Sequence, residues 1–296
     1  MHLVGTVLLF FASLLASCQA FKPVIIIHGL RQAASSLKDI DGYIREAHPG
    51  TEVTVLDLYT RDESYEAPMM EQVKDFGAAI KKISDAHPEG FHLIGFSQGG
   101  LIARGVLQIV PNLNIDTFIS LSSPQMGQFG DIASIRKYFP AFLKKELWRL
   151  LYNTRGQLLS FGGYWSDPMH VDSYRKTSKY LAYLNNETSD ASHVADSFQW
   201  KANFLRVQKL VLIGGPDDGT INPWQSAHFG YWRDCDRSLS VIVPMRDQEV
   251  YLMDSFGLKT LDQQGRIVIT TVPNTNHTMM HRDKNVVTSA VLPHLT

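Results

Sequence analysis

The residues Gly95, Phe96, Ser97, Gln98 and Gly99 form the pattern G-x-S-x-G. A serine at this spacing between two glycines is typical of a sharp turn from a strand into a helix, which strains the serine backbone and exposes its hydroxyl. Side chains two positions before and after the serine would collide in such a turn, so glycine is needed at both. We therefore predict Ser97 as a nucleophile for acyl transfer. The alternative is a glycine-rich turn whose serine only caps a helix.

A serine that takes up an acyl group needs backbone donors for the negative charge that forms on the substrate oxygen. The first expected donor is the backbone N–H of Gln98, at the start of the predicted helix. The second should follow an early strand, and the N–H of Leu30 in the segment His28-Gly29-Leu30 is the candidate. We expect His28 to shape this loop rather than to react, because the acid and base of this fold follow the nucleophile in the chain.

A serine hydroxyl is a poor nucleophile until a histidine takes its proton and a carboxylate orients that histidine. Asp217 and Asp218 lie just past a predicted strand that ends at Gly214 and Gly215, which is the place expected for the acid. The residues alone leave both aspartates open. His277 lies a few residues past the last predicted strand, which is the place expected for the base.

The other histidines are weaker candidates. His281 lies four residues after His277, so a metal-binding pair on one helix is an alternative. No glutamate follows His277 to complete H-E-x-x-H, so we expect neither a metal nor a cofactor. His170, His193 and His228 are expected at the surface or in ordinary packing.

An alternating α/β chain is predicted to position these residues. The β-branched run 24–27 is typical of a parallel strand buried on both faces. Further strands are predicted at 53–56, 91–94, 117–121, 210–213 and 266–272. Helices are predicted at 71–86, where apolar residues recur at helical spacing, at 101–110, and at the end of the chain at 286–295. The pattern favours the α/β-hydrolase fold, with a mostly parallel central sheet.

The segment between the fourth and fifth predicted strands breaks this alternation. Residues 125–205 are rich in aromatic side chains, namely Phe129, Tyr138, Phe139, Phe142, Trp148, Tyr152, Phe161, Tyr164 and Trp165. We predict a helical insertion over the carboxyl edge of the sheet, where ligands bind in open α/β sheets. The alternative is that these aromatic residues only pack against the sheet.

Length and composition are those of one globular domain. The chain has 296 residues, of which 44% are hydrophobic and 19% charged. The formal net charge is −1 and no long run of Lys or Arg is present. A nucleic-acid partner requires a basic surface, so that class is not expected.

The first twenty residues are predicted to be a signal peptide. Leu3 to Ala16 is nearly all apolar, is short for a membrane span and is followed by small residues. Cleavage after Ala20 or Cys18 would leave a single domain at about 21–296, without a transmembrane segment. The alternatives are a buried N-terminal helix and a bacterial lipoprotein box at 15–18, although no Lys or Arg precedes that box.

Cysteines and glycosylation triplets agree with a secretory route. Cys18 and Cys235 are the only cysteines, so the mature protein would carry one cysteine and no internal disulfide. Asn186 and Asn276 each begin an Asn-x-Ser/Thr triplet and are glycosylation candidates.

The stretch 93–101, with the sequence LIGFSQGGL, resembles the nucleophile turn of the palmitoyl-protein thioesterases. Similar stretches follow at 122–130, 164–168, 181–187 and 254–259. Those at 214–219, 223–226 and 229–230 look like the type 2 branch. The similarity covers nearly the whole mature chain.

This resemblance implies a soluble lysosomal or secreted enzyme that cleaves long-chain fatty acyl groups from thiols. By position it implies Ser97 as nucleophile, Asp218 as acid and His277 as base, and it thereby prefers the second of the two neighbouring aspartates. It also implies backbone oxyanion donors at Leu30 and Gln98.

One departure from the family concerns cysteine. Vertebrate-type members carry several paired cysteines that this chain lacks, and Gly95 and Ala103 stand at two such positions. The difference bears on stability in an oxidising, acidic compartment rather than on the chemistry. Three functions stay open: an acyl thioesterase, a lipase or esterase for oxoesters, and a binding protein on a dead hydrolase scaffold. Neither the acyl acceptor, the chain length, the pH optimum nor the oligomeric state follows from the sequence.

Overall fold

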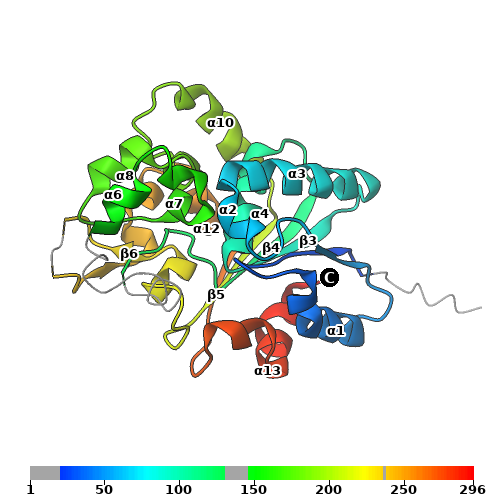
Figure 1. Ribbon diagram of the computed structural model, residues 1–296. Helices are drawn as coiled ribbons and strands as arrows, with labels where there is room; N and C mark the ends of the chain where they lie inside the picture. The colour runs from blue at the N-terminus through cyan, green and yellow to red at the C-terminus, as the bar shows by residue number, and fades with distance from the viewer. Residues whose placement is uncertain (1–20, 131–145, 236–237) are drawn as a thin grey trace, which may run out of the picture.

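A six-stranded parallel sheet forms the centre of the protein (Figure 1). The computed structural model describes residues 21–130, 146–235 and 238–296. The strand order is β2-β1-β3-β4-β5-β8 and every neighbouring pair is parallel, so the carboxyl ends of the strands share one edge. The strands are β1 (Val24–Ile27), β2 (Val53–Leu56), β3 (Phe91–Phe96), β4 (Ile115–Leu121), β5 (Lys209–Gly214) and β8 (Ile267–Thr271). The predicted parallel α/β sheet is confirmed.

The sheet is covered on both faces. The side chains of β1 alternate between two apolar clusters, and all four are buried, which explains the unbroken β-branched run. Helices α3 (Met69–Ala86) and α4 (Gln98–Ile109) contribute to the cluster on one face. Helix α1 (Lys38–Ala47) and the last residues of the chain contribute to the other, and Figure 1 shows them on the opposite side of the sheet.

The predicted closing helix at 286–295 is helical in the structure, but it is not a regular α-helix. The chain there forms a short helix α13 (Lys284–Val286), a π-helical turn (Val287–Val291) and a 3₁₀ turn (Leu292–His294). Pro293 has no backbone N–H to donate, and its ring would collide with the preceding turn of a regular α-helix. The helical turns therefore follow one another without a gap, but they change from α to π to 3₁₀ geometry.

Short helices occupy the connection between β4 and β5, as the insertion prediction required. They are α6 (Leu147–Leu151), α7 (Ser160–Tyr164), α8 (Val171–Thr177), α9 (Leu181–Leu184) and α10 (His193–Phe204). Figure 1 places them beside and above the carboxyl edge of the sheet. The predicted aromatic residues Tyr138, Phe139 and Phe142 lie outside the described residues.

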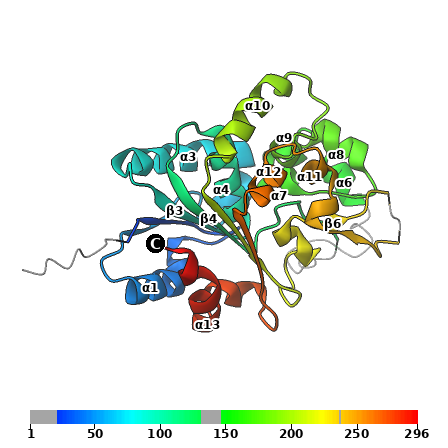
Figure 2. The ribbon, with the colours of Figure 1, turned by 180° about the vertical axis from the view of Figure 1, so that it is seen from behind.

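A second excursion, between β5 and β8, was not predicted. It contains the antiparallel pair β6 (Tyr231–Trp232) and β7 (Ile242–Val243), and the helices α11 (Glu249–Leu252) and α12 (Leu258–Gln263). Figure 2 shows α11 and α12 close to the helices of the insertion. Two-residue strands and helices of four and six residues are too short for periodicity to reveal them.

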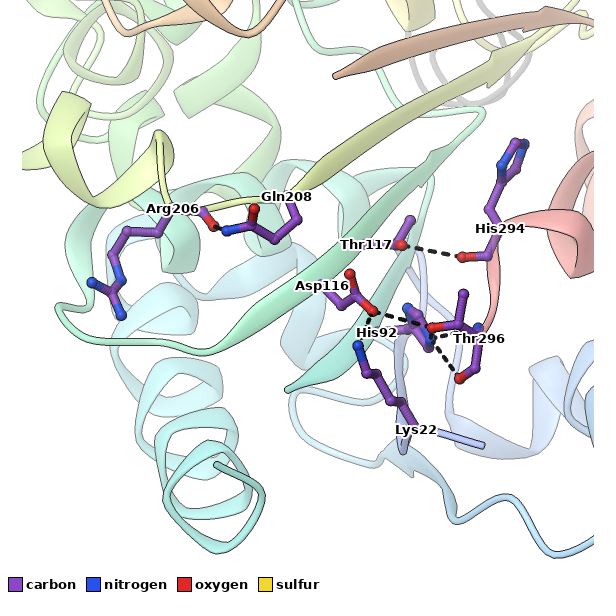
Figure 3. A network of polar contacts seen from close by, with 8 residues as sticks. All are labelled: Lys22, His92, Asp116, Thr117, Arg206, Gln208, His294 and Thr296. Atoms are coloured by element: carbon purple, nitrogen blue, oxygen red, sulfur yellow. Dashed lines mark hydrogen bonds and ion pairs between the residues drawn. The ribbon is translucent and has the colours of Figure 1, made fainter. Parts of the chain in front are cut away.

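The amino edge of the sheet is held by polar contacts between the two ends of the described chain (Figure 3). The backbone N–H of Lys22 donates to the carbonyl oxygen of Thr296 at 2.8 Å, and the Lys22 ammonium pairs with Asp116. The N–H of Thr296 donates to Nε2 of His92 at 2.9 Å, and its hydroxyl donates to Asp116 at 3.2 Å. This network lies at the opposite end of the strands from the G-x-S-x-G turn.

Candidate active site

Ser97 is the single residue between the end of β3 and the start of α4. Its backbone has φ 55° and ψ −126°, a conformation that L-residues rarely adopt. The Ser97 N–H donates to the carbonyl oxygen of Leu121 at 3.0 Å, and its own carbonyl accepts from the N–H of Gly100 at 3.0 Å. These two bonds fix the strained turn, which supports the predicted strand–turn–helix geometry.

Glycine is required on both sides of the serine. A Cβ built on Gly95 would lie within 3.0 Å of the backbone of Gly100, and one built on Gly99 would lie within 3.0 Å of the backbone of Ile27 and His28. Real Cβ atoms essentially never come so close to other heavy atoms. The predicted steric reason for the G-x-S-x-G pattern therefore agrees with the structure.

Three side chains from distant parts of the chain meet at this turn. The Nε2 atom of His277 lies 2.9 Å from Oγ of Ser97, and its Nδ1 atom lies 2.9 Å from Oδ2 of Asp218. An ionised carboxylate can only accept, so Nδ1 carries the hydrogen and Nε2 is left to accept a hydrogen bond from the Ser97 hydroxyl. Asp218 follows β5 and His277 follows β8. These strands are parallel neighbours and end at the same edge of the sheet, so the two residues lie close together.

The Asp218 carboxylate is buried, and both of its oxygens accept hydrogen bonds. Burial alone would raise the pKa of Asp218, but hydrogen bonds from His277 and from the Ile221 N–H outweigh it and hold the pKa below its ordinary value. Its Oδ1 accepts from the backbone N–H groups of Thr220 and Ile221, at 3.0 and 2.7 Å. The charged form is thus stabilised beside the histidine.

Asp217 occupies a different place. Its side chain is exposed and accepts from the backbone N–H of Asn274 at 2.7 Å, which ties together the loops after β5 and β8. The geometry therefore separates the two aspartates that the residues alone left open.

The two residues expected as oxyanion donors lie at the same cavity as the serine. Leu30 and Gln98 both line the cavity in front of Ser97. Gln98 is the first residue of α4, where N–H groups lack partners within the helix. The ring nitrogens of His28 lie 2.9 Å from the carbonyl oxygens of Gly29 and Leu58, so this histidine shapes the loop, as predicted.

A cavity of about 170 Å³ opens in front of Ser97 and His277. Helix α7 of the insertion contributes Phe161 and Tyr164 to its lining, and the apolar wall continues through Leu30, Phe96, Pro124 and Ile221. The hydroxyl of Tyr164 also donates to the side-chain oxygen of Gln98 at 3.0 Å. The insertion thus reaches the residue after the serine.

The sequence matches one family model along most of its length. The model described as palmitoyl protein thioesterase covers residues 23–277, from the start of the sheet to the histidine of the site. This chain belongs to the palmitoyl protein thioesterase family.

Curated relatives agree with this assignment. The lysosomal thioesterase PPT2 of Rattus norvegicus is 45% identical over 277 residues, covering 94% of this chain and 89% of the relative. The PPT2 homolog of Drosophila melanogaster is 39% identical over 93% of this chain and 92% of its own length. Palmitoyl-protein thioesterase 3 of Dictyostelium discoideum is 30% identical over 100% of this chain and 99% of its own length. The resemblance to the type 2 branch is confirmed.

Among solved structures, a monoacylglycerol lipase from Paleococcus ferrophilus aligns over 93% of this chain and 96% of its own, at 14% identity and a TM-score of 0.48. The parallel sheet and the G-x-S-x-G turn at the end of β3 identify the fold of this palmitoyl protein thioesterase family member as that of the α/β-hydrolases.

The four other histidines considered in the sequence lie in packing or in local polar contacts of this family member. His281 is fully buried with its ring 4.5 Å from the ring of Phe96, and burial lowers its pKa to about 4. Within residues 21–130, 146–235 and 238–296, no group of three His, Cys, Asp or Glu could hold a metal ion. His170 contacts Asp167, and His193 and His228 contact backbone carbonyl oxygens.

Two features of the site were missed in the sequence. The ring of Phe96 contacts the rings of both His277 and His281, with centroid distances of 4.8 and 4.5 Å. The side-chain nitrogen of Gln98 donates to the carbonyl oxygen of Ser64 at 2.8 Å and joins the turn to the segment before α3. Both residues stand at the variable positions of G-x-S-x-G, so their types carried no signal of these contacts.

Proposed function

We propose that the protein hydrolyses long-chain fatty acyl thioesters, of the S-acyl cysteine or acyl-CoA type, through an acyl-enzyme formed on Ser97. The carrying observation is the pair of 2.9 Å contacts that join Asp218, His277 and Ser97 at the wall of a partly apolar cavity. Membership of the palmitoyl protein thioesterase family supports a thioester as the substrate.

Acylation begins when Oγ of Ser97 attacks the thioester carbonyl carbon while its proton passes to Nε2 of His277. The N–H groups of Leu30 and Gln98 donate to the carbonyl oxygen as it becomes an oxyanion. The C–S bond then breaks, and the sulfur leaves as a thiol with the proton from His277. Asp218 holds the histidine in the tautomer that this transfer needs.

Deacylation repeats the sequence with water. His277 takes a proton from the water as its oxygen attacks the acyl carbon. The bond from that carbon to Oγ breaks, Ser97 recovers the proton from His277, and the fatty acid is released. No cofactor takes part in either half of this proposal.

The insertion is proposed to supply the site for the acyl tail. Phe161 and Tyr164 line the cavity, whereas Trp165 is fully buried and packs against Phe129 and Phe161. Each methylene removed from water contributes about 0.8 kcal/mol, so a longer tail in this cavity should bind more tightly. The described aromatic residues of the insertion are therefore divided between the cavity and the packing behind it.

We also propose the secretory route and the lysosome as its end point. Rat and Drosophila relatives carry the name lysosomal thioesterase, which supports this location. No described helix has the length and apolar character needed to cross a membrane. Residues 1–20, including Cys18 and Ala20, lie outside the described residues, and Cys235 is a free, exposed cysteine. N-terminal sequencing of the secreted protein should begin near Phe21, and an intact Met1 would contradict the route.

A matched substrate panel tests the proposed reaction. We expect a higher kcat/KM for palmitoyl-CoA and a palmitoylated cysteine peptide than for palmitoyl oxoesters of similar leaving group. Preference for the oxoesters would identify a lipase or esterase instead. An absence of hydrolysis, together with no labelling of Ser97 by a fluorophosphonate, would identify a binding protein on the hydrolase scaffold.

A further inference from the structure

A second hollow, of about 520 Å³, lies away from the site. It is bordered by the end of α9, by α10 and by α11 with the residues after it, and Figure 2 shows these helices on one side of the molecule. Apolar side chains line it, and no residue within the described ranges covers them. Phe198 and Met253 are each 73% exposed and Val194 is 55% exposed. Exposed apolar residues gathered in one hollow indicate a contact surface.

The charged residues around this hollow pair with one another. Lys201 lies 2.8 Å from a carboxylate oxygen of Asp254, and Arg175 lies 3.2 Å from one of Glu249. With Glu187, two basic residues face three acidic ones in the lining, so the hollow carries no excess positive charge. An anionic membrane surface attracts clusters of Lys and Arg, and an ionic ligand would have to break these pairs. A neutral occupant with apolar faces fits better.

Asn186, a glycosylation candidate, lies on the wall of the hollow, and a sugar is an occupant of this kind. It is exposed, lines the hollow and begins the triplet Asn186-Glu187-Thr188. It follows α9 with φ 56°, a left-handed conformation that asparagine tolerates, and its N–H donates to the carbonyl oxygen of Tyr183 at 3.0 Å. A sugar attached to this side chain starts at the edge of the hollow. Sugar rings present C–H faces that pack on aromatic rings, while their hydroxyls stay in water.

We propose that Asn186 carries an N-linked glycan whose first N-acetylglucosamine units lie in this hollow and cover Phe198 and Met253. The inference rests on the secretory route proposed above. Covalent attachment gives the sugar a high effective concentration, so weak packing is enough to seat it. The glycan thereby stabilises the contact between the insertion and the segment around α11.

Asn276, the other triplet, provides a comparison within the same chain. It immediately precedes His277, and its side-chain oxygen accepts from the N–H of Met279 at 3.2 Å. It does not line the hollow. A glycan at that position would start outside the hollow.

The test is a double-mutant cycle on the full chain secreted from eukaryotic cells. We expect intact mass to show a glycan at Asn186. Asn186→Gln should lower Tm by about 2 to 4 °C when Phe198 is present, and by less than about 1 °C in the Phe198→Ala background. Thr188→Val, which removes the triplet and keeps the asparagine, should give the same dependence on Phe198. Trimming the glycan to one N-acetylglucosamine should preserve most of the effect.

Two controls isolate the contact. Leu158 is 55% exposed and outside the hollow, so Leu158→Ala should leave the effect of Asn186→Gln unchanged. Asn276→Gln should change Tm equally with and without Phe198. An unoccupied Asn186, equal effects of Asn186→Gln in both backgrounds, or binding of the glycosylated protein to anionic vesicles through Phe198 would overturn the inference. The readouts are mass and Tm, so an unoccupied Asn186 in an active thioesterase refutes this inference alone.

Discussion

The buried His281 should make the protein less stable as the pH falls from neutral toward 4. Both of its ring nitrogens lie without a hydrogen-bond partner among the described residues, and the ring is fully buried against Phe96. Burial lowers its pKa from 6.5 to about 4, and the positive charge of Arg282 makes a smaller contribution in the same direction. In the unfolded chain His281 therefore binds a proton below about pH 6.5, whereas in the folded protein it binds one only below about pH 4. Unfolding is favoured in that window.

The magnitude follows from the shift. One pKa unit corresponds to about 1.36 kcal/mol, so a shift from 6.5 to about 4 lowers the free energy of unfolding by about 3 kcal/mol once the pH is below both values. At pH 5 the loss is about 2 kcal/mol relative to pH 7.5, because the unfolded histidine is already almost fully protonated there. A loss of this size lowers Tm by roughly 4 °C or more for a chain of this length.

The assay compares Tm at pH 7.5 and pH 5 for the wild type and for His281→Leu. Leucine has a volume similar to that of histidine and does not titrate. The variant should lose roughly 4 °C less than the wild type on acidification. Met279→Leu, in the same turn but without a titrating group, should keep the wild-type difference. Equal pH differences in the wild type and His281→Leu would refute the reasoning. His281→Leu should also leave kcat close to that of the wild type, which separates it from His277.

Three further predictions concern the proposed chemistry. His277→Ala should lower kcat about as much as Ser97→Ala, and the double variant should be hardly worse, because the two residues act as a unit; additive losses, measured in the same assay, would argue against this pairing. Asp218→Asn should lower kcat by roughly 10⁴-fold, since it favours the wrong histidine tautomer, and Asp217→Asn should cost far less; similar losses would contradict the assignment of the acid. Phe161→Ala should flatten the rise of kcat/KM with acyl length while sparing short thioesters, whereas equal losses at all lengths would make this residue a support of the fold.

The sheet was predictable because its strands carry a strong local signal. The run at 24–27 is buried on both faces, and every predicted strand is present with ends that differ by at most two residues. The end of the chain was less predictable. The residues at 286–295 are helical, but Pro293 is incompatible with a regular α-helix, and periodicity alone does not distinguish an α-helix from π and 3₁₀ turns.

The site was predictable where the chain order of a fold constrains it. The positions of Ser97 and His277 followed from the ends of two predicted strands. Asp217 and Asp218 are neighbours, so strand ends do not separate them; the family resemblance favours Asp218, and the contacts of the two carboxylates differ in the same sense. The contact from Tyr164 to Gln98 joins residues 66 positions apart, through an insertion whose helices are short. Contacts of this kind depend on tertiary packing, for which a single sequence carries no local signal.

The most direct test of the central claim is the fate of the acyl group on the enzyme. Wild-type protein mixed with palmitoyl-CoA and quenched rapidly should carry a transient palmitoyl adduct on the peptide that contains Ser97, detected by mass spectrometry. Ser97→Ala should carry none and should lower turnover by roughly 10⁴- to 10⁶-fold. Turnover near the wild-type value in Ser97→Ala, or a palmitoyl adduct on a different residue of an active enzyme, would contradict the account.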